Sequence, residues 1–158
     1  MRRLIVLSAV ALIAVFAAQA AASGPLRAKE PFHFEWVDDW TCPGTEITVV
    51  ADGSDNVREW EGRFMDHVIA VATLTANETT VTNNTSATYV FNEREGMLKI
   101  AGTLYNIQVP GEGVVLLDAG VVVFDTETGE VTREAGPHMQ LHGDVSRLCS
   151  YFAARGLL

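Results

Sequence analysis

Asp118 is the side chain of this sequence with the clearest potential for acid–base chemistry. It lies between Leu117 and Ala119, inside the most apolar stretch of the chain. A carboxylate in such surroundings must be hydrogen-bonded, paired with a charge or kept neutral, and a neutral carboxyl inside a cavity can act as a general acid. The alternative is a structural role, either as a strand-edge or surface aspartate or as a carboxylate that accepts backbone N–H groups at a bulge beside Gly120. Asp118 is therefore a catalytic candidate with a structural alternative.

Two histidines, His138 and His142, stand four residues apart, a spacing that returns both rings to one side of a helix or a strand. A metal site would need further ligands, which only Asp144, His33 or His67 could supply. The segment has no acidic residue between the histidines, unlike the helical zinc-hydrolase motif. We interpret both as loop or strand-edge residues and expect no metal.

Four ring-bearing side chains are candidates for contact with a small ligand in the interior of the protein. They are Trp60, His67, Tyr89 and Tyr105. Such side chains combine an apolar body with a polar atom that can orient a ligand. An aromatic residue in a strand belongs to the core by default, so packing is the alternative role. No phosphate loop, dinucleotide fingerprint or Cys-x-x-Cys motif occurs, and we expect no cofactor.

The stretch from residue 96 to 131 must position Asp118 and Tyr105. It holds two apolar runs separated by residues 110–113 and a third run that begins after the polar residues 125–129. Apolar runs bounded by turn residues are typical of strands. This stretch therefore predicts three strands of an antiparallel meander.

The upstream half of the chain has the alternating pattern of half-buried strands. The predicted intervals are 45–51, 57–60, 67–75 and 79–92. Asp52 and Gly53 predict a turn that closes the first interval. Gly102 and Gly120 lie inside later strands, which predicts bends, bulges or close backbone approach.

A single short helix is predicted at the end of the chain. Apolar residues recur at 145, 148, 149 and 152, which is helical spacing. Asp144 is placed to cap the N-terminus and Gly156 to end the helix, so the prediction covers residues 145–155. Cys149 lies on the apolar stripe of this helix.

The chain has two cysteines, Cys42 and Cys149, at opposite ends of the predicted folded segment. In an oxidising compartment an isolated pair of this kind usually forms a disulfide. Such a bond would tie the helix to the start of the strand at 45–51. The alternative is two free thiols, one of them a nucleophile served by a nearby histidine.

The first 23 residues have the three parts of an export signal. Arg2 and Arg3 precede an apolar run over residues 4–18, and small residues follow it. The apolar run is shorter than the ~20 residues that a membrane helix needs. We predict a cleaved signal peptide over 1–23 and a secreted, extracellular protein; an uncleaved anchor is the alternative.

The exported part is strongly acidic. Removing Arg2 and Arg3 from the 11 basic residues leaves 9 against 20 acidic residues, a formal charge of −11. Such a surface repels phosphate backbones and anionic lipids. We therefore expect no nucleic-acid partner and, after signal cleavage, no membrane partner, while the sequence indicates no oligomeric state.

Several segments resemble those of a group of small secreted actinobacterial proteins. They are "GVVLLDAGVVVFDTETGEV" at 113–131, "AGPH" at 135–138 and "LCSYF" at 148–152. The resemblance implies a barrel similar to the calycin or allene-oxide-cyclase type, and the group brings no established activity or site residues to transfer. We expect an all-β protein: an extended segment over 24–41, then one domain over 42–158, an antiparallel meander closing into a barrel of about eight strands. A β-sandwich is the alternative.

A barrel of this size leaves room for one small ligand, so the first functional hypothesis is a module that binds a small apolar molecule. An extracellular interaction or structural protein that works through an exposed face is the second. The third is a cyclase or isomerase that acts by confinement, with Asp118 as acid or base. It rests on analogy of fold alone.

Overall fold

The computed structural model describes residues 27–60 and 62–155 of the chain. The predicted signal peptide at 1–23 lies outside the described residues, as do the first three residues of the predicted extended segment. Among the described residues, no helix is long and apolar enough to cross a membrane.

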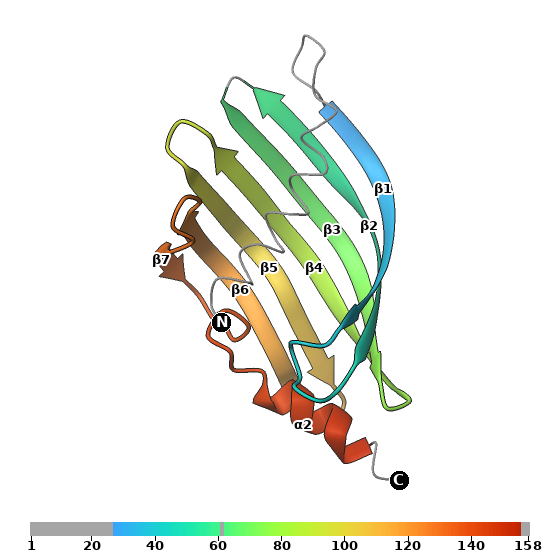
Figure 1. The fold of residues 1–158 in the computed structure, drawn as a ribbon. Coiled ribbons are helices and arrows are strands. Elements are labelled where there is room, and N and C mark those ends of the chain that lie inside the picture. Colours follow the sequence, from blue (N-terminus) through green and yellow to red (C-terminus); the bar gives the residue numbers. More distant parts are fainter. Residues whose placement is uncertain (1–26, 61, 156–158) are drawn as a thin grey trace.

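The described chain is a seven-stranded antiparallel meander followed by one helix (Figure 1). The strands are β1 (Arg27–Asp38), β2 (Ile47–Trp60), β3 (Arg63–Ala76), β4 (Thr79–Asn92), β5 (Met97–Val109), β6 (Gly113–Asp125) and β7 (Val131–Ala135), and the helix is α2 (Ser146–Arg155). Each strand pairs with its neighbours in chain order. The predicted all-β meander and the short C-terminal helix are confirmed.

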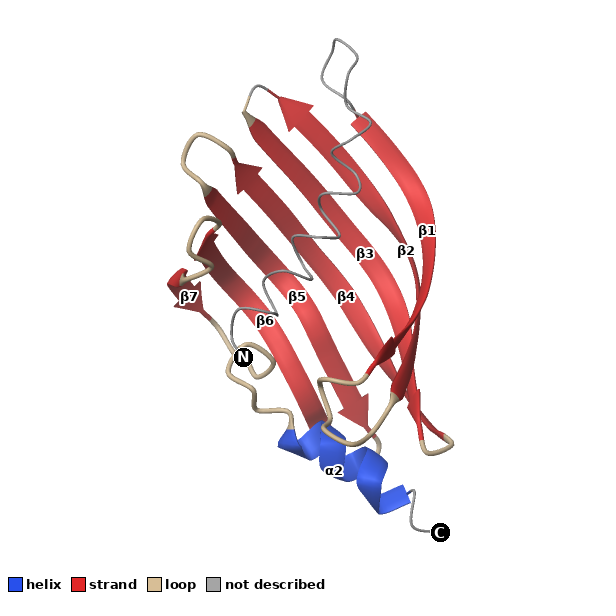
Figure 2. Cartoon of the chain, in the orientation of Figure 1, coloured by secondary structure: helices blue, strands red, loops and turns tan. Residues whose placement is uncertain are grey.

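The predicted closure into a barrel of about eight strands does not occur in the described part of the chain, and neither does the sandwich. The strands form one curved layer with α2 across one end (Figure 2). β1 and β7 are the two edges of this sheet. β7 has five residues, and its ladder with β6 covers only Val121–Phe124 before the chain turns away. So short an edge cannot complete the ring of hydrogen bonds that a barrel requires.

The turn predicted at Asp52 and Gly53 is wrong, because β2 runs straight through both residues. Gly53 pairs with Phe32 on one side and Ala70 on the other. A Cβ atom at Gly53 would lie 2.6 Å from the Phe32 ring and 2.5 Å from the Ile69 carbonyl oxygen. Gly53 therefore leaves space for the Phe32 ring and does not end a strand.

The close backbone approach predicted at Gly102 and Gly120 is confirmed. The two residues face each other across β5 and β6, with φ angles of 126° and 127°. A Cβ atom would collide with the Ser86 carbonyl oxygen at Gly102 and with the Ala135 carbonyl oxygen at Gly120. The ladders are irregular beside Gly102, so these positions bend the sheet.

The hydrophobic core lies on one face of the sheet, which we call the inner face. Successive side chains of a strand point to opposite faces, and paired residues share a face. Leu148 and Phe152 of α2 are fully buried against the inner face. Their partners on the strands include Ile47, Val49, Leu74, Val81, Ile107 and Leu116.

The predicted disulfide joins Cys42 and Cys149, whose Cα atoms are 5.3 Å apart. It ties α2 to the segment just before β2, as expected. Cys42 is buried in the same core as Leu148 and Phe152. The helix is therefore held to the sheet by both packing and a covalent bond.

Candidate functional site

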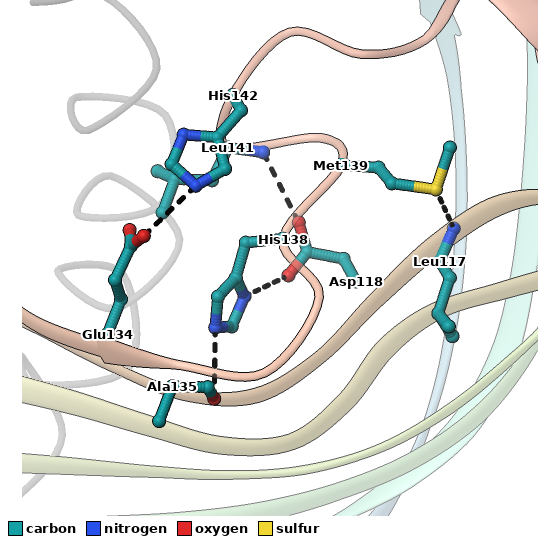
Figure 3. Close-up of polar contacts among 8 residues, drawn as sticks. All are labelled: Leu117, Asp118, Glu134, Ala135, His138, Met139, Leu141 and His142. Atoms are coloured by element: carbon teal, nitrogen blue, oxygen red, sulfur yellow. Dashed lines mark hydrogen bonds and ion pairs between the residues drawn. The ribbon is translucent and has the colours of Figure 1, made fainter.

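Asp118 projects from β6 on the inner face and is bound to His138 (Figure 3). The Asp118 Oδ1 and His138 Nδ1 atoms are 2.9 Å apart, and the residues are only 4% and 5% exposed. The second carboxylate oxygen, Oδ2, accepts a hydrogen bond from the Leu141 backbone N–H at 3.3 Å. Both oxygens of Asp118 are thus occupied by the chain itself.

The bonds around His138 fasten the segment from 136 to 142 to the edge of β6. His138 Nε2 lies 3.3 Å from the Ala135 carbonyl oxygen, so each ring nitrogen faces an oxygen acceptor. Met139 adds a backbone bond to the Leu117 carbonyl at 3.2 Å. The role of Asp118 in this arrangement is structural, but it is a buried pair with His138 and not the surface or bulge position expected from the sequence.

The two histidines at spacing four do not converge. His142 lies 3.1 Å from Glu134 Oε1 on the exposed side of the segment, whereas His138 points to buried Asp118 (Figure 3). Over residues 27–60 and 62–155, no three metal-ligating side chains come together. Each histidine instead has its own carboxylate partner.

The four ligand-contact candidates are divided between the faces of the sheet. Tyr89 and Tyr105 lie on the inner face, where Tyr105 pairs with Asp118. His67 lies on the outer face and is bonded to the Thr88 hydroxyl at 2.9 Å. Trp60 is 43% exposed at the end of β2. The structure therefore brings the tyrosines together with Asp118, but not with His67 or Trp60.

The two inner-face tyrosines are neutral over the physiological pH range. Burial raises the pKa of each phenol to about 12, and nearby Asp118 adds to the effect at both. At Tyr89, the other phenol and Asp66 also contribute. Neither hydroxyl forms a hydrogen bond with another residue that the structure describes.

Asp55 and Asp66 are inner-face carboxylates that sequence reasoning missed. Asp66 pairs with Tyr89 across the β3–β4 ladder and with Val57 across β2–β3. The Oδ1 atoms of both aspartates are buried without a hydrogen-bond partner among the described residues. Burial first, and then the charge of Asp55, raise the pKa of Asp66 to about 6.

A parity signal for Asp66 was available in the sequence. Every even position from 68 to 74 is apolar, whereas the odd positions are mixed, and Asp66 continues the even parity onto the same face. Asp55 was not assigned to a face of the sheet, because the turn predicted at Asp52 and Gly53 ended the strand before it. Once β2 is continuous, Asp55 follows Gly53 on the inner face.

Charge is segregated between the two faces of the sheet. The inner-face charged residues of β1 to β6 are all acidic: Glu30, Asp38, Asp55, Glu59, Asp66 and Asp118. The lysines and arginines of the strands whose side chains are described all fall on the outer face: Lys29, Arg58, Arg63, Lys99 and Arg133. The inner face is therefore apolar and acidic.

Asp66 lies in a larger surface at the end of the inner face that is distant from α2. We call this surface the Asp66 patch. It consists of Val57, Phe64, Asp66, Tyr89, Phe91, Leu98, Ile100, Val122 and Phe124, which the strand register places side by side. Of the described elements, α2 packs at the other end of the inner face, on the core that contains Ile47 and Leu116. Within the patch, Leu98 and Val122 are buried and the other residues are partly exposed. Its side chains could surround an apolar molecule, and its carboxylate could accept a hydrogen bond from it.

Comparison with protein-family models, with curated proteins and with solved structures finds no match for this chain. Functional inference for this protein therefore depends on the geometry of the inner face.

Proposed function

We propose that this protein is an extracellular binding module that holds a small, largely apolar molecule on the inner face of its sheet. The observation that carries this proposal is the Asp66 patch, in which the register of β2 to β6 aligns apolar side chains into one surface. Small-molecule sites are typically concave and apolar, with a few polar groups that fix orientation. The patch has this composition.

The polar atoms of the inner face also support the proposal. The hydroxyls of Tyr89 and Tyr105 remain protonated and have no partner in the described chain. Each can donate one hydrogen bond to a ligand and accept another. Asp118 does not share this property, because His138 and Leu141 already occupy its oxygens. Binding is therefore better supported than acid–base catalysis by Asp118.

Titration with a neutral fluorescent probe, N-phenyl-1-naphthylamine, tests the proposal. Val122 and Val123 are adjacent on β6 and point to the inner and outer faces. Val122→Gln places an amide in the patch and should weaken probe binding about tenfold, a loss of roughly 1.4 kcal/mol. Val123→Gln makes the same change on the outer face and should leave binding unchanged.

Thermal unfolding of both variants establishes that binding is compared between folded proteins. The purified wild type should also release a bound small molecule into organic solvent, detected by mass spectrometry. A wild type that neither binds the probe nor carries such a molecule would refute the proposal. Equal losses in the two valine variants would place the site elsewhere.

A further inference from the structure

We propose that the ligand of the inner face is an organic cation, an apolar molecule with an ammonium or similar group, held by Asp55 and Asp66. This inference rests on the proposed function and adds the chemical class of the ligand. The apolar part of the molecule lies on the Asp66 patch. The positive group lies against the two carboxylates.

Asp55 is a buried carboxylate that lacks a full set of hydrogen-bond partners among the described residues. Its side chain is 8% exposed, and its Oδ1 atom is buried without a hydrogen-bond donor in the described chain. Leaving a buried carboxylate oxygen unpaired is costly, and native proteins rarely do so without a functional reason. Asp66 repeats the pattern: the nearby Asn56 backbone N–H lowers its pKa somewhat, while its Oδ1 atom has no hydrogen-bond partner among the described residues.

Asp55 and Asp66 lie close together on the inner face. The β2–β3 register pairs Ser54 with Ile69 and Val57 with Asp66, so Asp55 lies diagonally across the ladder from Asp66. Side chains at diagonal positions of neighbouring strands are within reach of each other. Their mutual repulsion contributes to the raised pKa of Asp66. A cation between them would relieve this repulsion and supply the missing donors.

The surroundings of Asp55 and Asp66 on the inner face favour a positively charged ligand. The strand lysines and arginines with described side chains lie on the outer face, so none of them neutralises this pair. Tyr89 and Phe64 flank Asp66 on the inner face, and aromatic rings attract cations. A bare metal ion fits less well, because Ca²⁺ takes six to eight oxygen ligands and the described residues offer no group of three acidic, histidine or cysteine ligands here.

Three probes with one skeleton and different charge test the inference: 4-phenylbutylammonium, 4-phenylbutanol and 4-phenylbutyrate. Isothermal titration at pH 8 and low salt keeps Asp66 ionised, because its pKa is about 6. We expect the ammonium to bind about tenfold or more tightly than the alcohol, and the carboxylate to bind most weakly. The double variant Asp55→Asn/Asp66→Asn should reduce this preference to less than about twofold while alcohol binding persists.

Asp52→Asn is the matched control, since it makes the same change on the outer face of β2 and should keep the full preference for the ammonium. Equal binding of the three probes overturns this inference and leaves the proposed function standing. Failure of all three to bind, together with N-phenyl-1-naphthylamine, overturns both. Displacement of the ammonium by millimolar Ca²⁺, at constant ionic strength, would assign the carboxylates to a metal instead.

Discussion

At the scale of single residues, the buried carboxylates of the inner face differ in whether their oxygens have hydrogen-bond partners. Asp118 has both oxygens engaged by His138 and Leu141. Asp55 and Asp66 each keep one buried oxygen without a partner among the described residues. Engaged carboxylates hold a structure together, whereas unengaged ones lower its stability unless something binds them. The function of this protein is therefore better sought at Asp55 and Asp66 than at Asp118.

Asp66 should make the stability of the protein depend on pH. Its pKa is about 6 in the folded protein and 3.8 without the surrounding structure, so the folded state binds the proton more tightly. Stability should rise as the pH falls from about 7 towards 4. Asp66→Asn should raise the free energy of unfolding at pH 7.5 by about 1 kcal/mol, after allowance for partial solvent exposure, and should have no effect below pH 4.

Urea unfolding between pH 4 and pH 8 measures this effect. Asp39→Asn, at an exposed position outside the sheet, is the control for loss of a negative charge. If the stability of Asp66→Asn differed from that of the wild type by the same amount at every pH, the raised pKa of Asp66 would be contradicted.

At the scale of elements, the Asp118–His138 pair attaches an irregular segment to the sheet. The segment from 136 to 145 connects β7 to α2, and its bonds to β6 place the helix over the core. The alternation of strands alone does not determine where such a connection lies. The buried Asp118–His138 pair fixes the position of this segment, which the backbone hydrogen bonds of the sheet do not determine.

Breaking this pair at one side should cost more than removing it altogether. His138→Leu leaves Asp118 buried with an unpaired oxygen and should lower the free energy of unfolding by about 3 kcal/mol. The double variant Asp118→Leu/His138→Leu should recover most of this loss, because no buried charge is left unpaired. Urea unfolding of His138→Leu, Asp118→Leu and the double variant measures the coupling.

His142→Ala is the control, since its bond to Glu134 is exposed and should be worth less than about 1 kcal/mol. Strict additivity of the Asp118 and His138 substitutions would show that the two residues act independently.

At the scale of the whole molecule, the sheet is open and has two different edges. β7 is short, and its ladder with β6 is irregular. β1 is long, but it carries Pro31 and a high density of charged residues. Proline cannot donate to a ladder, and charges on an edge discourage pairing with other chains. Pro31 thus marks β1 as an edge strand already in the sequence.

The disulfide is the largest covalent constraint on the fold, because it closes a loop between residues 107 positions apart. Chain-entropy arguments assign roughly 4–5 kcal/mol to a loop of this size. Cys42→Ser/Cys149→Ser should therefore lower the urea midpoint strongly, with a loss of roughly 3–5 kcal/mol. Thiol labelling under denaturing conditions should find no reactive cysteine in the wild type. Labelling of two thiols, or an unchanged midpoint, would contradict this expectation.

The sequence by itself determined the meander, the final helix and the disulfide of this protein. Apolar alternation and helical spacing are local signals, and the two cysteines have only each other as partners within the chain; the structure confirms the strands, the helix and the disulfide. The roles of Gly102 and Gly120 were also visible, because a glycine inside a strand usually marks a bend or a close approach of another backbone.

Only the tertiary structure decided that the sheet stays open and which side chains meet on its inner face. Closure into a barrel requires a last strand long enough to pair with the first strand. The length of β7, five residues, could not be predicted from its sequence alone. The meeting of Asp55 with Asp66 depends on the β2–β3 register, and thus on whether Gly53 ends a strand or admits the Phe32 ring. Whether Gly53 ends a strand or lies within one depends on residues that are distant in the sequence. The face on which a side chain lies is set by the register between strands and not by its neighbours along the chain.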